Sequence, residues 1–131
     1  KDSLMIDILL LTILFYFIQI PLPMIVSVIN GVPFSHYLST RDGVVKIPNL
    51  SERFIRAHNN LKESLFIFIP LSLLSIIINV DVLMAATIWL VLRVIYVILY
   101  SLGVTYIRTI LWFISIICLV DMGIRLFKHS I

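Results

Sequence analysis

Long apolar stretches separated by short polar segments dominate this sequence. Four of the stretches have the roughly 20 residues that a helix needs to cross a bilayer. They cover residues 4–29, 49–79, 82–100 and 105–126. Pro21 and Pro23 interrupt the first stretch, which predicts a kinked helix. The links at 79–81 and 101–104 are so short that the helices they join are expected to be antiparallel neighbours.

The segment 30–48 is the only long connection between these stretches. The second helix is predicted to begin just after it, because Asn49 can cap a helix and Glu52 follows three residues later, as in a capping box. The first turns of this helix are polar, so it should begin outside the hydrocarbon and then enter it. The pattern predicts one domain over residues 1–131 with an all-α fold, a four-helix transmembrane bundle.

Composition excludes an ordinary soluble domain. Hydrophobic residues make up 61% of the chain and charged residues 13%, whereas soluble domains have about half and about a quarter. The chain is therefore expected to be an integral membrane protein. Its single cysteine, Cys118, excludes an intramolecular disulfide and a cysteine-cluster metal site, and its apolar surroundings indicate a buried, unreactive thiol. The net charge of +3 does not indicate nucleic-acid binding, because the basic residues gather at helix ends.

Basic residues are shared unevenly between the two ends of the predicted bundle. The end with the long connection holds Arg41, Lys46, Arg53, Arg56, Lys62, Arg93 and Arg108. The opposite end holds Lys1, Arg125 and Lys128. Because cytoplasmic loops carry the excess of Lys and Arg, the long connection is expected in the cytoplasm and both termini outside. The richness in Ile and Leu suits a bacterial inner membrane.

Polar and charged residues inside membrane spans are costly and often functional. Here they share one face of the second span, one face of the third, and the start of the fourth. They are Arg56, Asn60 and Glu63, then Arg93, Tyr96 and Tyr100, then Arg108 and Thr109. Guanidinium groups bind carboxylates, a carboxylate binds an amine, and tyrosine hydroxyls donate hydrogen bonds. The set suits a small ligand with several carboxylates and an amine; alternatively, the charges pair with each other and extend to the membrane surface.

Residues 56–63, Arg-Ala-His-Asn-Asn-Leu-Lys-Glu, resemble the Arg-Ala-His-x-Asn-x-x-Glu signature of the MAPEG family, the membrane-associated proteins in eicosanoid and glutathione metabolism. The preceding Thr-Arg-Asp-Gly at 40–43 and the segment 47–53 are similar to the loop of bacterial members. Residues 93–100 and the Arg108-Thr109 pair are similar to the third and fourth spans of the family. The resemblance extends over nearly the whole chain.

This resemblance implies a homotrimer that binds glutathione as a co-substrate between protomers, near the cytoplasmic side and without a metal. The positions that match the glutathione site are Arg56, Asn60, Glu63, Arg93, Tyr96, Tyr100, Arg108 and Thr109. Arg108 matches the arginine that stabilises the glutathione thiolate. The implied activity is that of a transferase or peroxidase, in which the thiolate attacks a lipophilic electrophile or a lipid hydroperoxide from the bilayer.

Two departures from the family pattern leave another function open. Asn59 stands where eicosanoid-type members often have a second arginine, and Pro70 lies about two turns beyond Glu63 rather than about one. A non-catalytic trimer that serves as an accessory or scaffold subunit of a larger membrane assembly would also fit. A small exporter of drugs or protons fits less well, because Asp7 lies near the end of the first span rather than in its middle.

Overall fold

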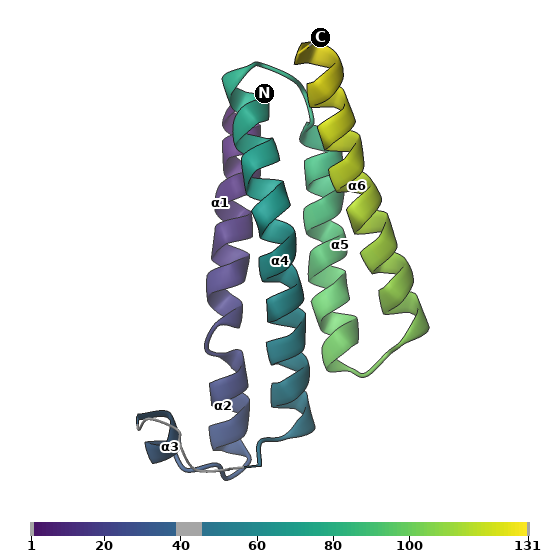
Figure 1. Cartoon of the computed structure of the whole chain (residues 1–131). Helices are drawn as coiled ribbons and strands as arrows, with labels where there is room; N and C mark the ends of the chain where they lie inside the picture. The colour runs from purple at the N-terminus through teal and green to yellow at the C-terminus, as the bar shows by residue number, and fades with distance from the viewer. Residues whose placement is uncertain (1, 39–45, 131) are drawn as a thin grey trace.

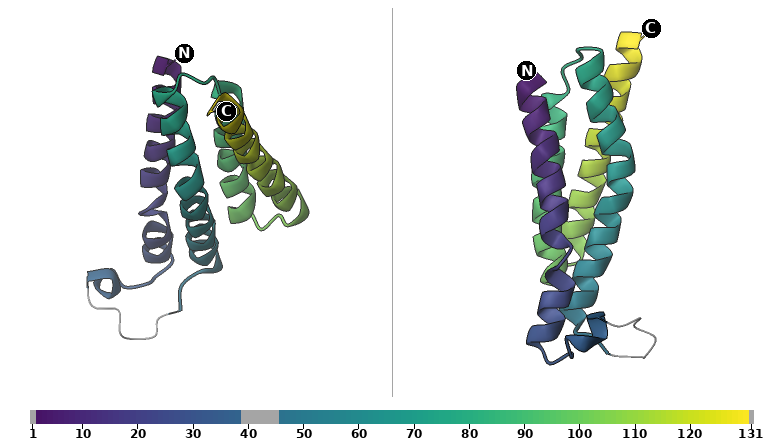
Figure 2. Two further views of the ribbon diagram at one scale, coloured as in Figure 1. Left: turned by 45° about the horizontal axis from the view of Figure 1, so that its top comes forward. Right: turned by 90° about the vertical axis from the view of Figure 1, so that its left-hand side faces the viewer.

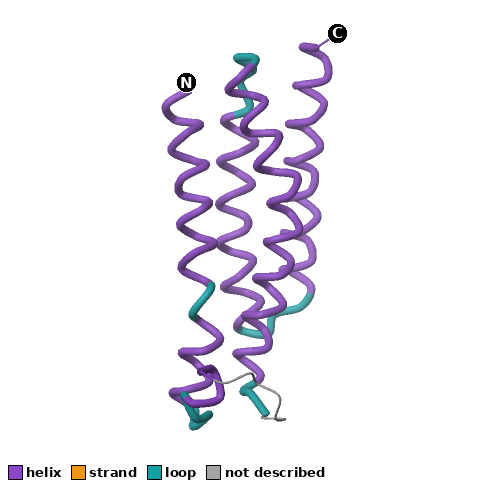
Figure 3. Tube along the Cα trace, turned by 60° about the vertical axis from the view of Figure 1, so that its left-hand side comes forward, coloured by secondary structure: helices purple, strands orange, loops and turns teal. Residues whose placement is uncertain are grey.

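The computed structural model describes residues 2–38 and 46–130, which contain helices and no strand (Figure 3). The helices are α1 (Asp2–Gln19), α2 (Leu22–Ile29), α3 (Ser35–Leu38), α4 (Asn49–Ile77), α5 (Leu83–Ser101) and α6 (Tyr106–Ser130). Four segments are long and apolar enough to cross a membrane, namely Ser3–Ile29, Asn49–Ile77, Leu83–Ser101 and Tyr106–His129. The all-α fold with four long apolar helices is confirmed. The fourth span extends past the predicted end at 126, as far as His129. Asp121 and Arg125 form an ion pair across one turn just before that predicted end.

The helices form a bundle of long antiparallel columns (Figure 1). α1 and α2 together form one column beside α4, and α5 lies beside both α4 and α6 (Figure 2). Both chain ends and the α4–α5 link lie at one end of the bundle, which we call the terminal end. α3 and the α5–α6 link lie toward the opposite end, which we call the loop end. The short links therefore join antiparallel neighbours, as predicted.

The first span is broken at the predicted prolines. α1 ends at Gln19, and Pro21 stands at the N-terminal boundary of α2. Proline has no backbone N–H and obstructs the preceding turn, so a continuous helix through this point would lose hydrogen bonds. The backbone recovers after two residues, because the N–H of Ile25 donates to the carbonyl of Pro21 at 2.9 Å. The predicted kink is confirmed.

α4 begins at Asn49 without the predicted capping box. Pro48 occupies the boundary position in an extended conformation, and no side chain caps the helix there. Asn49 is already the first helical residue and so cannot act as the cap. The fixed φ of Pro48 is suited to the entry of the chain into the helix. Glu52 instead lies 3.9 Å from Arg56 of the next turn.

Buried hydroxyl groups join α2 to the first turn of α4. The Ser51 hydroxyl donates to the carbonyl of Pro23 at 2.9 Å and lies 2.8 Å from the Ser27 hydroxyl. Both serines are fully buried. The Pro23 carbonyl lies just below the break in the span, so Ser51 gives a polar backbone group a partner inside the bundle.

Replacing Ser51 by alanine should therefore destabilise the bundle. We expect Ser51→Ala to lower the free energy of unfolding by about 1 kcal/mol, because hydrogen bonds between helices are lost in a buried position. Ser101→Ala is the matched control, since the Ser101 hydroxyl donates only within its own helix, to Ile98 at 2.7 Å. Thermal unfolding in detergent, followed by circular dichroism, measures both. Equal effects of the two substitutions would contradict the proposed role of the α2–α4 contact.

The apolar core lies between α1, α4, α5 and α6. Phe68 stacks on Trp89 with ring centroids 3.9 Å apart and planes 10° from parallel, and Met122 of α6 is buried in the same cluster. The free thiol of Cys118 is buried too, as predicted. Large apolar side chains such as Phe66, 74% exposed, cover the outside of the bundle. A surface of this kind suits acyl chains rather than water.

Some sequence predictions fall outside the described residues. They include the Thr-Arg-Asp-Gly motif at 40–43, the contribution of Arg41 to the basic end, and that of Lys1 to the opposite end. The other basic residues of the two ends lie in the described part of the chain.

Candidate functional site

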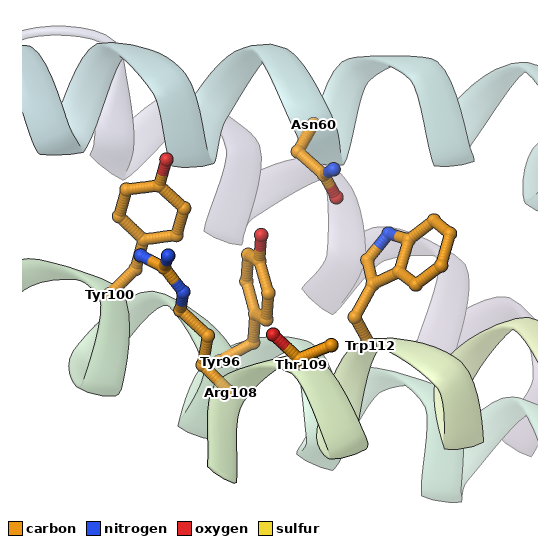
Figure 4. A pocket seen from close by; sticks show the side chains of 6 residues that line it. All are labelled: Asn60, Tyr96, Tyr100, Arg108, Thr109 and Trp112. Atoms are coloured by element: carbon orange, nitrogen blue, oxygen red, sulfur yellow. The ribbon is translucent and has the colours of Figure 1, made fainter. Parts of the chain in front are cut away.

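A cavity of about 290 Å³ lies between α4, α5 and α6, toward the loop end of the bundle (Figure 4). Its lining comes from all three helices and consists of Asn60, Tyr96, Tyr100, Arg108, Thr109 and Trp112. The short α5–α6 link places the first turns of α6 opposite the last turns of α5. Five of the predicted site residues are therefore brought together around one space.

Arg93 lies behind the cavity rather than in its lining. Its side chain is 1% exposed, and its Nη2 donates to the Asn60 Oδ1 at 2.8 Å. Its guanidinium carbon also lies 4.5 Å from the centre of the Tyr96 ring. Nε and Nη1 have no hydrogen-bond partner among the described residues. The structure thus places Arg93 next to two cavity residues, which it holds in position from inside the bundle.

This contact fixes which side of the Asn60 amide faces the cavity. A guanidinium group can only donate hydrogen bonds, so the Asn60 carbonyl oxygen must point toward Arg93. The amide nitrogen is then left to donate into the cavity. In Figure 4 the Asn60 amide, the Tyr96 hydroxyl and the indole nitrogen of Trp112 point toward the same space. These donors favour a ligand rich in hydrogen-bond acceptors.

Tyr100 lies between two guanidinium groups. Its hydroxyl accepts a hydrogen bond from the Nε of Arg56 at 3.1 Å, and the guanidinium carbon of Arg108 lies 4.2 Å from the centre of its ring. The hydrogen bond from Arg56 and the cation–π contact of Arg108 thus hold two positive charges next to Tyr100. Arg56 does not line the cavity itself but reaches its rim through Tyr100.

Arg53 belongs to the same basic region, although the sequence prediction of the site did not include it. Its Nη1 donates to the carbonyl of Ser101 at 3.3 Å. A Cβ at Gly103 would lie 3.4 Å from this guanidinium group, and Gly103 has a positive φ of 80°, which glycine adopts without strain. Arg53 lies three residues before Arg56 on α4, and this helical spacing is the signal that could have identified it.

Trp112 is the second residue that the sequence prediction missed. It lies four residues after Arg108 on α6, and so on the same face of the helix. A tryptophan near the end of a span is typical of the aromatic belt at the membrane interface, so its position in the sequence alone does not indicate a site. The adjacent Thr109 hydroxyl donates to the carbonyl of Thr105 at 3.2 Å, which leaves its oxygen as an acceptor at the cavity.

Glu63 is not brought to the cavity. It lies one turn beyond Asn60 on α4, is exposed, and has no ion pair within residues 2–38 and 46–130. His58 also lies off the cavity face. Its Nε2 lies 3.3 Å from the carbonyl oxygen of Tyr16, and the two rings are 4.2 Å apart, so His58 joins α4 to α1.

The described residues contain no group of three His, Cys, Asp or Glu side chains that could hold a metal ion. What they contain is a set of arginine, tyrosine and amide groups at one end of a membrane-spanning helical bundle. This combination can bind an anion and stabilise negative charge close to the apolar phase. The class of protein is therefore a small polytopic membrane protein whose cavity is lined by basic and hydrogen-bonding side chains.

The family follows from the comparison with known families. The MAPEG family model matches residues 7–128, and the chain belongs to this family. The match covers nearly the whole chain and all four spans, which confirms the resemblance seen in the sequence. No curated protein and no solved structure matches the chain.

Proposed function

We propose that the protein binds glutathione in the cavity between α4, α5 and α6 and acts as a glutathione-dependent transferase or peroxidase. The observation that carries the proposal is the convergence of Asn60, Tyr96, Tyr100 and Arg108 from three helices on one cavity. Membership in the MAPEG family supports it. Glutathione carries carboxylates, amides and a thiol, and this cavity offers mainly donors and guanidinium groups.

We assign the guanidinium groups two different roles, one in ligand binding and one in catalysis. Arg53 and Arg56 lie at the rim near the α5–α6 link, where they can bind the carboxylates of the tripeptide. Arg108 lines the cavity itself, so we assign it to the thiol. A positive charge next to a thiol favours the thiolate and lowers the pKa of the thiol.

The thiolate would then react with a co-substrate that enters from the bilayer. With an electrophilic carbon, the sulfur forms a carbon–sulfur bond and a leaving group departs or a double bond is saturated. With a lipid hydroperoxide, the sulfur attacks the terminal oxygen, the O–O bond breaks and a lipid alcohol leaves; a second glutathione then converts the sulfenic acid to the disulfide and water. No metal takes part in either reaction.

A homotrimer belongs to this proposal. In the single protomer Glu63 and Arg56 are exposed, although both match positions of the family's glutathione site. A neighbouring protomer on this face would cover both and complete the binding site. The exposed arginine and carboxylate would then lie at the boundary between subunits, where they can contact the ligand from two sides.

Calorimetric titration of the purified protein with glutathione tests the binding. We expect binding in the millimolar range or tighter, and we expect Arg56→Ala to weaken it about tenfold, because a charge-assisted hydrogen bond is worth roughly 1.5–3 kcal/mol. Arg125→Ala is the matched control, since Arg125 is an exposed arginine paired within α6 near the terminal end. No heat of binding at millimolar glutathione would contradict the proposal.

The second candidate function is that of a non-catalytic trimer in a larger membrane assembly. The departure at Asn59 favours it, because a second arginine that eicosanoid-type members often have at this position is absent. Glutathione binding without turnover of electrophiles or hydroperoxides would identify this second function. Co-purification with a defined membrane partner would support it.

The orientation in the membrane is also a proposal. Lys46, Arg53, Arg56 and Arg108 lie toward the loop end, so the positive-inside rule places this end in the cytoplasm of a bacterial inner membrane and both termini outside. In a Cys118→Ser background, we expect Lys46→Cys to react with an impermeant thiol reagent only after the cells are opened. Lys128→Cys should react in intact spheroplasts. The reverse pattern would contradict the orientation.

A further inference from the structure

Tyr96 presents a hydroxyl group to the cavity from a largely buried position. The residue is 6% exposed, yet it belongs to the cavity lining, and Figure 4 shows its hydroxyl pointing toward the cavity. In the described part of the chain this hydroxyl makes no hydrogen bond, whereas the Tyr100 hydroxyl accepts one from Arg56. The Tyr96 hydroxyl is therefore available to whatever occupies the cavity.

A buried cation lies directly beside this tyrosine. Arg93 is 1% exposed, its guanidinium carbon lies 4.5 Å from the centre of the Tyr96 ring, and its Nε and Nη1 have no hydrogen-bond partner among the described residues. Within residues 2–38 and 46–130 no carboxylate forms an ion pair with Arg93. A buried positive charge without a counter-charge stabilises a negative charge that forms on a neighbouring group. Arg93 therefore stabilises the phenolate that remains when Tyr96 gives up its proton.

The other groups of the cavity lining are poorer proton donors. A guanidinium group keeps its charge in proteins, and amide, indole and threonine hydroxyl groups hold their protons more firmly than a phenol does. The Thr109 hydroxyl moreover donates to the carbonyl of Thr105 at 3.2 Å. Of the two phenols in the lining, Tyr96 is the one whose hydroxyl is not hydrogen-bonded to a neighbouring side chain within the described residues.

We propose that Tyr96 is the general acid of hydroperoxide reduction and donates its proton to the alkoxide that leaves when the O–O bond breaks. This inference rests on the proposed function, and it names lipid hydroperoxides as the substrate class that uses the Tyr96 hydroxyl. An alkoxide is a strong base and leaves far more easily when a proton is delivered to it. Conjugation of a chlorinated arene needs no such group, because chloride leaves without a proton.

Protons and electrons balance over one turnover. The glutathione thiolate attacks the terminal oxygen of the hydroperoxide, the O–O bond breaks, and the departing alkoxide takes the proton of Tyr96 to become the alcohol. The Tyr96 phenolate then takes the proton of a second glutathione, whose thiol is a stronger acid than a phenol. The new thiolate attacks the sulfenic sulfur, and the hydroxide that leaves combines with the proton released by the first thiol to give water. Two glutathione molecules are oxidised to the disulfide, and one hydroperoxide is reduced to the alcohol and water.

The ratio of two turnover rates of the purified protein tests this role. At saturating glutathione, Tyr96→Phe should lower kcat with an alkyl hydroperoxide about 10²-fold relative to kcat with chlorodinitrobenzene, the lower end of what a general acid contributes. Tyr100→Phe is the matched control, because it removes the hydroxyl of the other phenol in the lining, and it should leave this ratio as in the wild type. Tyr96→His should restore part of the hydroperoxide rate, because imidazole returns a group that can donate a proton.

A second measurement uses the wild type and does not depend on the folding of a variant. Deuterium oxide should slow hydroperoxide reduction more than it slows conjugation, because a proton moves as the O–O bond breaks. Either an equal loss of both rates in Tyr96→Phe or equal isotope effects in the wild type would overturn the role of Tyr96 and leave the proposed function in place. Conjugation without hydroperoxide reduction in the wild type would overturn that role as well. Absence of both reactions in the wild type would overturn the proposed function together with this inference.

Discussion

Arg108→Ala should lower the turnover of glutathione-dependent reactions by about 10²- to 10³-fold, the range typical for the removal of one group that stabilises a developing or resting anion. Arg108 lines the cavity and its guanidinium carbon lies 4.2 Å from the Tyr100 ring, so the charge is held in place before the ligand arrives. Without this charge the thiolate form of bound glutathione is less stabilised, so a smaller fraction of the thiol is ionised. The initial rate with a lipophilic electrophile, at saturating glutathione, measures the effect.

The pH dependence separates this role from a merely structural one. A free thiol of this kind has a pKa of about 8.5, and the Arg108 charge should lower the pKa of the bound thiol. The rate of the wild type should therefore reach its plateau at a lower pH than that of Arg108→Ala, whose rate should continue to rise through the ordinary thiol range. Arg108→Lys should recover part of the rate, because the charge returns without the fork geometry. A wild-type thiol that titrates like free glutathione would contradict the assignment.

The fold could be predicted from the sequence because the bilayer sets a minimum length for each apolar stretch. The break at Pro21 was predictable as well, since proline removes a backbone donor wherever it stands. The start of α4 was not, because Pro48 and Asn49 both favour a helix start and only the backbone shows which residue takes the boundary position. Sequence preferences for helix starts therefore restrict the boundary to a few residues but do not determine which residue occupies it.

The sequence predicts the candidate site well where its residues share one helix face. It predicts less well the contacts that residues make between two helices. The spacing of Tyr96 and Tyr100 correctly places them on one face of α5, and both line the cavity. The burial of Arg93 and the contact of Arg53 with Ser101 depend on how α4 and α5 are rotated against each other. Apolar patterning alone determines that rotation only coarsely, since polar residues occur on the buried face of α4.

Asn60→Asp should abolish most glutathione binding while it leaves the bundle as stable as before. In the wild type, the Nη2 of Arg93 lies 2.8 Å from the Asn60 oxygen, and Arg93 is 1% exposed. The carboxylate of the variant keeps an acceptor for this Nη2 and adds an opposite charge next to the guanidinium group. The unfolding temperature should therefore be unchanged or higher, since the buried cation gains a counter-charge. The amide nitrogen that donates into the cavity is lost.

The same substitution, Asn60→Asp, should lower the affinity for glutathione although it preserves the stability of the fold. A carboxylate at position 60 places a negative charge in a cavity that is proposed to hold an anionic tripeptide and its thiolate. Loss of one donor and gain of one like charge should together weaken glutathione binding by about 10²-fold. Calorimetric titration measures the affinity, and thermal unfolding of the same samples shows that the fold is intact.

Asn59→Asp is the matched control for this experiment. Asn59 is the neighbouring residue on α4, carries the same side chain, is exposed, and does not line the cavity. The two variants have the same net charge, so any general effect of an added carboxylate on an anionic ligand appears in both. A selective loss of binding in Asn60→Asp would place the ligand at the face of α4 that Arg93 holds from behind. Wild-type affinity in Asn60→Asp would contradict the assigned site, because Asn60 lines the cavity of about 290 Å³ in which the ligand is proposed to lie.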